Sequence, residues 1–486
     1  MALMNQKMKS LLEKKEVVLV KPAKPTPNEV LSLSTMDSDY NLELLCQTLY
    51  VYQSNITSSN AHQEENGTKS CSQNQKDPAL VAKEALSRAL VYYYPLAGKL
   101  KRQENDGRLQ ITCTADGVPF LEAIANENLS SFNYFDGIDV EIGKQFVFDW
   151  PTESQYGYHP LVIQVIIAPT FVTKFSCGGF TIGMGLSHSV CDGYGAAQFF
   201  RALTELATGK HEPTLKPVWE RERLMGKPNQ DCAFLHLVNH APLVTSPFLP
   251  ATELSHECFN VDEDSIITLK NRLGKETINN KNQIPVENFT TLEVLGAYVW
   301  RSRYRALKQN PDGKTLFCLA VGIRNLMNPP LSKGYYGNAF VSANVELFGE
   351  ELNNEPLSKI AALIKQSKKI ASTNEHIRNS LNLLETMRQK KMKIVDNSGG
   401  GGALILTDWR QLRLLEEEDF GWKRSVNMIP LPWQMFGYVD LCIFMPPSRV
   451  QNAKEGGVRV LVSLPGAAMD RFKEEMAALK IKHGDI

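Results

Sequence analysis

The spacing of apolar residues changes repeatedly between a helical and a strand period along the whole chain. Apolar residues recur at helical spacing in segments that we predict to be helices, namely 78–94, 196–208, 288–307, 357–369 and 467–479. Short β-branched runs bounded by turn residues predict strands over 16–20, 109–113, 161–167, 315–320 and 458–464. Because helices and strands are mixed along the full length, we expect an α/β fold in which mixed sheets are flanked by helices.

The length of the chain predicts two domains, and one stretch without a regular spacing of apolar residues predicts the linker between them. At 486 residues the chain exceeds the size at which a single hydrophobic core stops growing. The stretch 211–235 holds prolines and many charges but no clear period, so we predict a crossover linker there. The expected domains are therefore residues 1–210 and 236–486. Two further segments, the polar stretch 54–77 and the glycine-rich stretch 396–402, are expected to be loops.

Charge is balanced over the chain, which disfavours several classes of partner. Lysine plus arginine and aspartate plus glutamate each number 53, so no overall field attracts nucleic acid or an anionic membrane. The nine cysteines are scattered without a metal-type spacing, and their odd number favours reduced thiols. No apolar run is long enough for a signal peptide or a membrane span, so we expect a cytoplasmic protein.

A histidine at the end of a predicted strand is the first candidate for catalysis. The glycine-interrupted apolar run 175–186 is followed by a turn that contains His188, Asp192 and Gly193, and then by a predicted helix. Strand ends deliver side chains to sites, and an imidazole accepts a proton at neutral pH without special activation. The same spacing also fits a solvated histidine beside a carboxylate. A zinc pair is disfavoured, because the other histidines suggest no third ligand.

Several motifs along the chain resemble one protein family. Residues 187–193 carry a His-x-x-x-Asp-Gly signature, and residues 419–423 are similar to a second signature, Asp-Phe-Gly-Trp-Gly. Further similar stretches occur in the same order at 92–100, 299–301 and 328–338. The chain thus resembles, over essentially its full length, the BAHD family of plant acyl-CoA-dependent acyltransferases. Within that family it looks most like the clade of spermidine hydroxycinnamoyl transferases.

This resemblance implies both a fold and a reaction. The implied fold is chloramphenicol-acetyltransferase-like, with two similar-sized domains, each a mixed sheet flanked by helices, joined by a long crossover loop. Family members have a channel between the domains where acyl-CoA and the acceptor meet. Carried over, His188 is the general base that deprotonates the acceptor for direct attack on the thioester in a ternary complex. The resemblance also implies a monomer with acyl-CoA as co-substrate and with neither a permanent cofactor nor a metal.

The resemblance assigns supporting roles to other residues of the two signatures. Asp192 is expected to point away from the channel and to pair with Arg324, and with Gly193 it is expected to hold the turn that aims His188. The second signature is expected to act as a packed loop near the CoA channel, through Asp419, Gly421 and Trp422. Lys423 stands where the family has glycine, so local strain is expected there if that position needs a positive φ.

Candidate binding residues come from two further segments. Thr290 and Glu293 form a capping-box pattern at a helix start, where free N–H groups suit a phosphate. Family members use this region for the CoA nucleotide, so the resemblance implies CoA contacts at Thr290 and Thr291. In relatives the segment at 403–409 reaches the catalytic centre. The expected channel residues of this segment are Thr407, Asp408 and Trp409. The reaction needs a stabiliser for its oxyanion, whereas Thr407 can also simply pair within the sheet.

The predicted function is acyl transfer from an acyl-CoA, with a hydroxycinnamoyl or other aromatic acyl group, to an amine such as spermidine. The Asp408 carboxylate would suit the remaining cationic nitrogens of a polyamine. One alternative is an O-acyltransferase that makes benzoyl or acetyl esters of an alkaloid, benzyl-type or terpenoid alcohol. Another is a catalytically silent binding protein of the same fold. The intact His188, Asp192 and Gly193 argue against that second alternative.

Overall fold

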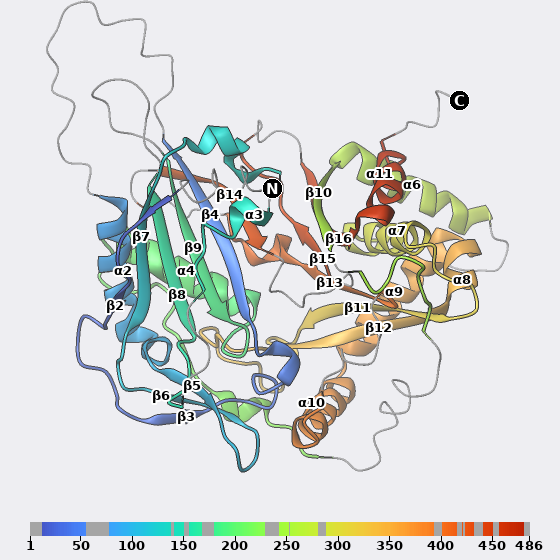
Figure 1. The fold of residues 1–486 in the computed structure, drawn as a ribbon. Coiled ribbons are helices and arrows are strands. Elements are labelled where there is room, and N and C mark those ends of the chain that lie inside the picture. Colours follow the sequence, from blue (N-terminus) through green and yellow to red (C-terminus); the bar gives the residue numbers. More distant parts are fainter. Residues whose placement is uncertain are drawn as a thin grey trace, which may run out of the picture.

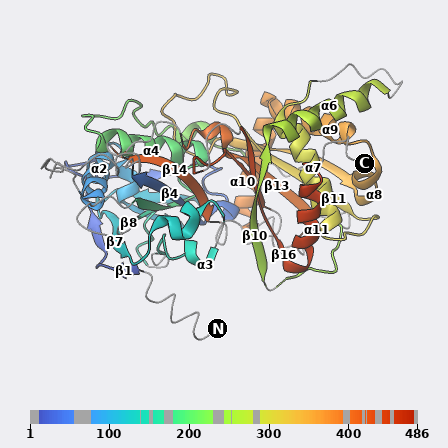
Figure 2. The same ribbon diagram turned by 90° about the horizontal axis from the view of Figure 1, so that it is seen from above.

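Two large mixed sheets form the two halves of the molecule, and helices cover them (Figure 1). Figure 2 shows these halves side by side. The computed structural model describes residues 12–54, 77–137, 140–149, 155–167, 179–228, 243–251, 253–279, 288–392, 401–415, 420, 423–431, 441–450 and 456–480. None of the helices within these ranges is both long enough and apolar enough to cross a membrane.

The sheet of the first half has the strand order β1-β7-β8-β9-β4-β14, and β2 also pairs with β7. The pairing of β7 with β8 is parallel, and the other pairings are antiparallel. The central strand β8 is almost entirely apolar and buried, as expected for a strand covered on both faces. The strands are β1 (Leu12–Lys14), β2 (Val18–Val20), β4 (Leu45–Ser54), β7 (Val118–Ala125), β8 (Leu161–Ile167), β9 (Phe180–Ser187) and β14 (Lys423–Leu431).

The sheet of the second half has the strand order β10-β16-β15-β13-β11-β12. The strand β13 is parallel to both of its neighbours. Its strands are β10 (Leu254–Asp262), β11 (Lys314–Gly322), β12 (Phe340–Phe348), β13 (Ala403–Asp408), β15 (Leu441–Met445) and β16 (Gly457–Pro465). A small third sheet contains β3 (Val30–Ser32), β6 (Leu109–Thr112) and β5 (Lys99–Arg102).

Helices of both halves pack on these sheets. In the first half, α2 and α4 lie against each other and against the sheet, and in the second half α7 packs between α6, α9 and α11 (Figure 2). The longer helices are α2 (Pro78–Tyr92), α4 (Gly193–Ala207), α6 (Glu263–Asn279), α7 (Thr291–Ala306), α9 (Leu357–Ala371), α10 (Asn374–Gln389) and α11 (Gly466–Ala477). The shorter ones are α3 (Val140–Gly143), α8 (Gly349–Asn354) and the 3-10 turns η1 (Tyr40–Leu42), η3 (Tyr94–Ala97), η4 (Leu129–Phe135), η5 (Arg221–Leu224) and η7 (Trp409–Leu412).

One strand crosses from the second half into the first. Residues 423–431 were expected within a domain spanning 236–486, but they form strand β14, which pairs antiparallel with β4 along the edge of the first sheet. In Figure 1 it lies beside the blue strand β4. The expected boundaries therefore do not describe residues 423–431, because strand pairing follows free sheet edges rather than chain order. The division of the remaining chain stays a prediction.

The predicted linker is also more ordered than its composition indicates. Within the part of it that the structure describes, Val218 N–H donates to Gly334 O at 2.8 Å and forms a bridge with Tyr335. The turn η5 buries Arg221, which is only 1% exposed. The segment up to residue 228 is thus packed between the two halves.

A buried polar cluster joins the two sheets on the side of β14. The Arg459 guanidinium on β16 donates to Asn427 Oδ1 on β14 at 2.8 Å and to Met428 O at 3.2 Å. The Asn427 amide in turn donates to the carbonyls of Tyr134 and Phe135 at 3.0 and 2.8 Å. These two residues have the positive φ values 49° and 57°, which side chains rarely adopt. Asn427 therefore holds the end of η4 in place and links it to the second sheet.

Replacing Asn427 with alanine is expected to lower the free energy of unfolding by about 2–4 kcal/mol, because several buried polar groups then lose their partner. Urea denaturation followed by circular dichroism measures this change. Asn379→Ala at an exposed position of α10 is the matched control, with an expected change below about 0.5 kcal/mol. Equal effects of the two substitutions would contradict the role assigned to Asn427.

Candidate active site

A cavity of about 1020 Å³ lies between the two sheets and is lined by residues of both halves. The first half contributes residues of β4, β9 and α4, and the second half contributes residues of α7, β11, β12 and β13. The cavity brings together the predicted site residues His188, Asp192, Gly193, Thr290, Thr291, Arg324, Thr407, Asp408 and Trp409. Residues separated by more than 200 positions in sequence thus meet in one space.

His188 follows directly on β9, and its backbone is fixed on both sides. Its N–H donates to Leu44 O at 2.9 Å, and its carbonyl accepts from Asn338 Nδ2 at 2.7 Å. The half-buried ring lies 6.1 Å from the Phe340 ring, centre to centre. Its buried Nδ1 has no hydrogen-bond partner among the described residues. The fold therefore positions this imidazole through its backbone and leaves Nδ1 unused.

Asp192 does not orient the histidine, because its carboxylate is occupied elsewhere. The expected ion pair with Arg324 is present and bidentate, at 2.8 and 2.7 Å. The same carboxylate accepts from Gly195 N and Ala339 N, each at 3.0 Å, and so caps α4. Burial raises the pKa of Asp192, but the Arg324 charge and these hydrogen bonds outweigh burial and lower the pKa overall. Asp192 thus joins the end of β9 to the β11–β12 connection as a fixed anion.

Space at this turn is tightest at Gly195, which faces backbone, whereas Gly193 faces the end of a leucine side chain. A Cβ atom at Gly193 would approach the Leu412 side chain to 2.7 Å, and one at Gly195 would lie 1.9 Å from Tyr336 O. The conformational role expected for Gly193 is therefore a close approach rather than a positive φ. Gly193 and Gly195 were together predicted from sequence to make a tight turn.

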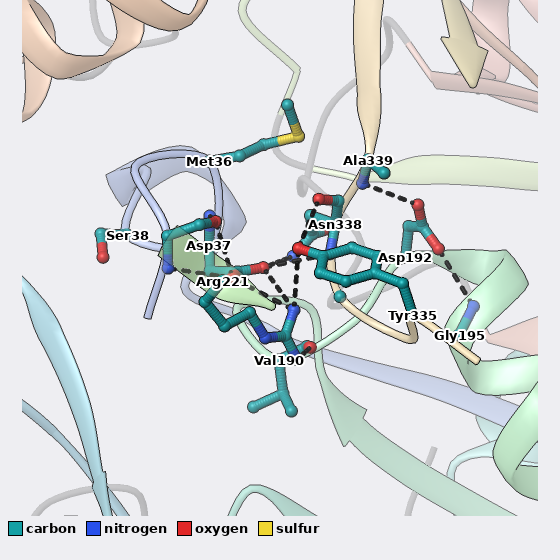
Figure 3. A network of polar contacts seen from close by, with 12 residues as sticks. Met36, Asp37, Ser38, Val190, Asp192, Gly195, Arg221, Tyr335, Asn338 and Ala339 are labelled. Atoms are coloured by element: carbon teal, nitrogen blue, oxygen red, sulfur yellow. Dashed lines mark hydrogen bonds and ion pairs between the residues drawn. The ribbon is translucent and has the colours of Figure 1, made fainter. Parts of the chain in front are cut away.

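A buried polar network around Asp37 and Arg221, which the sequence reading also missed, lies next to this turn (Figure 3). The Arg221 guanidinium pairs with the Asp37 carboxylate at 3.1 Å, and neither side chain is more than 1% exposed. Asn338 donates through Nδ2 to Asp37 Oδ1 at 2.8 Å as well as to the carbonyl of His188. Arg221 also donates to Val190 O at 2.8 Å. The network therefore donates hydrogen bonds to two backbone carbonyls of the turn, those of His188 and Val190.

Aromatic rings enclose the cation of this network. The guanidinium carbon of Arg221 lies 4.5 Å from the centre of the Trp219 ring and 4.9 Å from that of Tyr336. Burial lowers the pKa of Arg221, but the Asp37 carboxylate and the nearby Tyr335 raise it overall. Arg221 remains charged, so its ion pair with Asp37 is maintained. Its only sequence signal was an arginine in a charged segment that otherwise looks like a linker.

The start of α7 forms one end of the cavity. The predicted capping box is confirmed: Thr290 N donates to Glu293 Oε2 at 2.7 Å, and Glu293 N donates to Thr290 Oγ1 at 3.4 Å. Lys368 on α9 pairs with Glu293 at 2.8 Å and also lines the cavity. Positive charge and helix N–H groups therefore meet beside Thr291.

The segment 407–409 forms another wall. The Thr407 hydroxyl makes no hydrogen bond to another described residue, although its backbone pairs with Ile443 in the sheet. The Asp408 carboxylate is not free, because the Arg410 guanidinium binds it with two contacts of 2.8 and 2.6 Å. Any further cation that binds this carboxylate therefore shares it with Arg410.

Two cysteines, Cys46 and Cys191, also line the cavity. Burial raises the pKa of Cys46 to about 12. It also raises the pKa of Cys191 well above its usual range. Since the thiolate is the nucleophilic form, neither thiol is suited to carry an acyl group.

The second signature lies mostly outside the described residues. This is the case for Asp419, Gly421 and Trp422. Lys423 is the first residue of β14 and pairs with Ser54. It therefore lies in an extended strand, a conformation that any residue adopts without the strain expected from sequence.

Comparisons with known proteins agree over nearly the full length. A sequence model described as the Transferase family matches residues 11–479. The chain is 42% identical to the spermidine coumaroyl-CoA acyltransferase of Arabidopsis thaliana, over 97% of this chain and 96% of that protein. It is 39% identical to the spermidine sinapoyl-CoA acyltransferase of the same plant, over 97% and 98%. The crystal structure of vinorine synthase superposes with a TM-score of 0.67 at 22% identity, over 96% and 98% of the two chains. The expected two-domain α/β fold is thereby confirmed.

Replacing Asp37 with asparagine is expected to lower the free energy of unfolding by about 3–5 kcal/mol, because Arg221 is left buried without its counter-charge. Asp106→Asn is the matched control. Asp106 is 50% exposed and lies 3.9 Å from Arg108, so its charge is expected to contribute less than about 1 kcal/mol. Urea denaturation of both variants measures the difference. A mild effect at Asp37 would show that the network is not required for stability.

Proposed function

Because the chain belongs to the Transferase family, also known as BAHD, and is an acyl-CoA-dependent acyltransferase, we propose that it transfers a hydroxycinnamoyl group to an amine of spermidine. The observation that carries the proposal is the position of His188 on the wall of a cavity shared by both halves. The two Arabidopsis relatives named for spermidine support the choice of acceptor.

His188 acts as the general base in this proposal. An alkylammonium group has a pKa of about 10, so the acceptor nitrogen has to lose a proton before or during its attack on the thioester carbonyl. That proton leaves to solvent before the attack, the imidazole takes a second proton from the attacking nitrogen as the C–N bond forms, and the C–S bond breaks. The proton then passes to the departing CoA thiolate. A thioester is already activated, so positioning and a base supply most of the remaining rate enhancement.

The other groups of the cavity support direct transfer. Thr407 offers a hydroxyl without a protein partner in the described part of the chain, and we propose that it donates to the developing oxyanion. The raised pKa of the cavity thiols Cys46 and Cys191 argues against an acyl-enzyme on cysteine.

The ion pair of Asp192 and Arg324 keeps the turn of His188 rigid, which is the structural role we assign to both residues. We propose a packed supporting loop for Asp419, Gly421 and Trp422.

We propose that acyl-CoA enters beside the start of α7. Thr290 and Thr291 line the cavity there, and the first helical N–H groups suit a phosphate. Lys368 supplies a cation at the same place. Acyl-CoA is the co-substrate in this scheme.

The remaining ammonium groups of spermidine need a carboxylate, and Asp408 is the proposed one. Its pair with Arg410 lies at the cavity wall, and both side chains keep some exposure, 13% and 18%. A carboxylate has about four lone-pair sites, so an ammonium group can bind Asp408 beside the Arg410 guanidinium.

We also propose that the enzyme works as a monomer in the cytoplasm. The cavity and its polar groups come from a single chain, so no second copy is required for the site. The six described cysteines are free thiols, which suits a reducing compartment.

His188→Ala is expected to abolish acyl transfer, because no other imidazole lines the cavity within the described residues. The purified enzyme is incubated with coumaroyl-, caffeoyl-, sinapoyl-, benzoyl- and acetyl-CoA against spermidine and a set of alcohols, and CoA thiol release is followed. Release with spermidine that disappears in the variant is the expected result. Release only with alcohols would move the function to ester formation, and silence of the native protein throughout the panel would favour a binding protein.

Lys368→Gln is expected to raise the KM for acyl-CoA about tenfold with little change in kcat, since a lost charge-assisted contact costs about 1.5 kcal/mol. Lys368→Arg should retain most of the affinity. Lys369→Gln, an exposed neighbour on α9, is the control. Steady-state kinetics at saturating acceptor measures the effect, and an unchanged KM for Lys368→Gln would remove this residue from the CoA site.

A further inference from the structure

A second concave site lies in the helical layer of the second half, apart from the catalytic cavity. Its volume is about 200 Å³, roughly one fifth of the catalytic cavity, and the two share no lining residue. It is lined by Arg272 of α6, by Tyr298, Arg301 and Arg305 of α7 and by Glu475 of α11, helices that lie together in Figure 2. Arg301 follows Thr290 by about three helical turns, or about 16 Å.

Positive charge exceeds negative charge in this pocket. Three of its lining residues are arginines and one, Glu475, is a carboxylate. That carboxylate already pairs with Arg471 at 2.9 Å and lies 3.6 Å from Arg305. Concave walls of low dielectric strengthen the field of such a cluster. An anion that enters the pocket is therefore attracted.

Two of the arginines are held in place by carbonyl groups. Arg301 Nε donates to Leu352 O at 2.7 Å, and its Nη2 donates to Glu355 O. Arg305 Nε donates to Asn353 Oδ1 at 2.8 Å. These neutral acceptors at the end of α8 orient the guanidinium groups without cancelling their charge. The fork of each arginine is thereby pre-organised before any ligand binds.

Unlike Arg301 and Arg305, Arg272 does not bind the end of α8. Within the ranges that the structure covers, Arg272 has no hydrogen bond and no ion pair, yet it lines the pocket. Burial and then the charge of Arg305 lower the pKa of Arg301 to about 10, and Arg272 contributes to the same lowering. Arg301 is still a cation at neutral pH, so the positive charges of Arg272, Arg301 and Arg305 repel one another.

Two of the carboxylates near the cluster are shared with other cations. Glu355 pairs with Lys359 at 2.9 Å, and Glu475 pairs with Arg471 at 2.9 Å. Glu276 accepts only from the neutral Ser358 N–H at 3.2 Å, so its charge still acts on Arg301. Neutralisation of the arginine cluster by protein groups is thus incomplete.

We propose that this pocket binds a small divalent oxyanion of the phosphate class, with the guanidinium groups of Arg272, Arg301 and Arg305 as its donors. Guanidinium forks match the oxygen geometry of phosphate, and such charge-assisted bonds are the strong ones. The small volume suits a free anion or a single phosphate group and excludes a whole nucleotide.

Calorimetric titration with inorganic phosphate tests the site directly. The full-length enzyme is first saturated with CoA, so that the start of α7 is occupied, and potassium chloride at equal ionic strength serves as the blank. Saturable binding is expected, weakened about tenfold or more in Arg272→Gln, which removes one charge-assisted donor. Arg378→Gln, at an exposed position of α10, should bind phosphate like the native protein. Absent binding, or equal binding by Arg272→Gln, overturns the proposal.

A second arm separates free phosphate from the 3′-phosphate of CoA. The KM values for an acyl-CoA and for the matching dephospho-CoA thioester are expected to be the same in Arg272→Gln as in the native enzyme. A raised KM for the acyl-CoA alone would assign the arginines to the co-substrate and overturn a separate site. The titration itself needs no turnover, so its outcome is independent of which acceptor the enzyme uses.

Discussion

The buried ion pair of Asp37 and Arg221 is the interaction on which the arrangement of the site depends. Removing two charges from water is expensive, and the expense is offset only when the two charged groups also find further polar partners. Here Ser34 and Asn338 donate to the Asp37 carboxylate and Val190 O accepts from Arg221, whereas Arg221 Nε and Asn338 Oδ1 have no partner among the described residues. The pair therefore requires three remote parts of the chain to be in place at once, and the backbone of His188 is fixed as a consequence.

Local pattern was sufficient for much of the fold. The helices α2, α7 and α9 begin at the expected residues or within three of them, and β8 has the expected bounds, because each carries a clear period or a capping signal. Helix α6 had such a signal in Ile266, Leu269 and Leu273 but was not predicted. The lining of the catalytic cavity by nine expected residues followed from family motifs rather than from any period.

Contacts between residues far apart in the chain could not be predicted from the sequence. Asp37 and Asn338 are 301 positions apart, and no local rule connects them. The pairing of β14 with β4 was missed for the same reason, since a strand pattern specifies a face but not a neighbour. The composition of the predicted crossover linker 211–235 did not show that Arg221 is buried, because charge alone does not distinguish a solvated side chain from a buried partner.

The position of β14 at the edge of the first sheet has a consequence for synthesis of the chain. Translation proceeds from the N-terminus, so the ribosome completes β4 and β9 long before residues 423–431 are made. Throughout that interval the backbone N–H and C=O groups on the outer edge of β4 lack their final strand, and such an edge pairs readily with other chains. The first half therefore reaches its native sheet only after residues 423–431 have emerged, and the edge of β4 stays open to pairing with other chains until then.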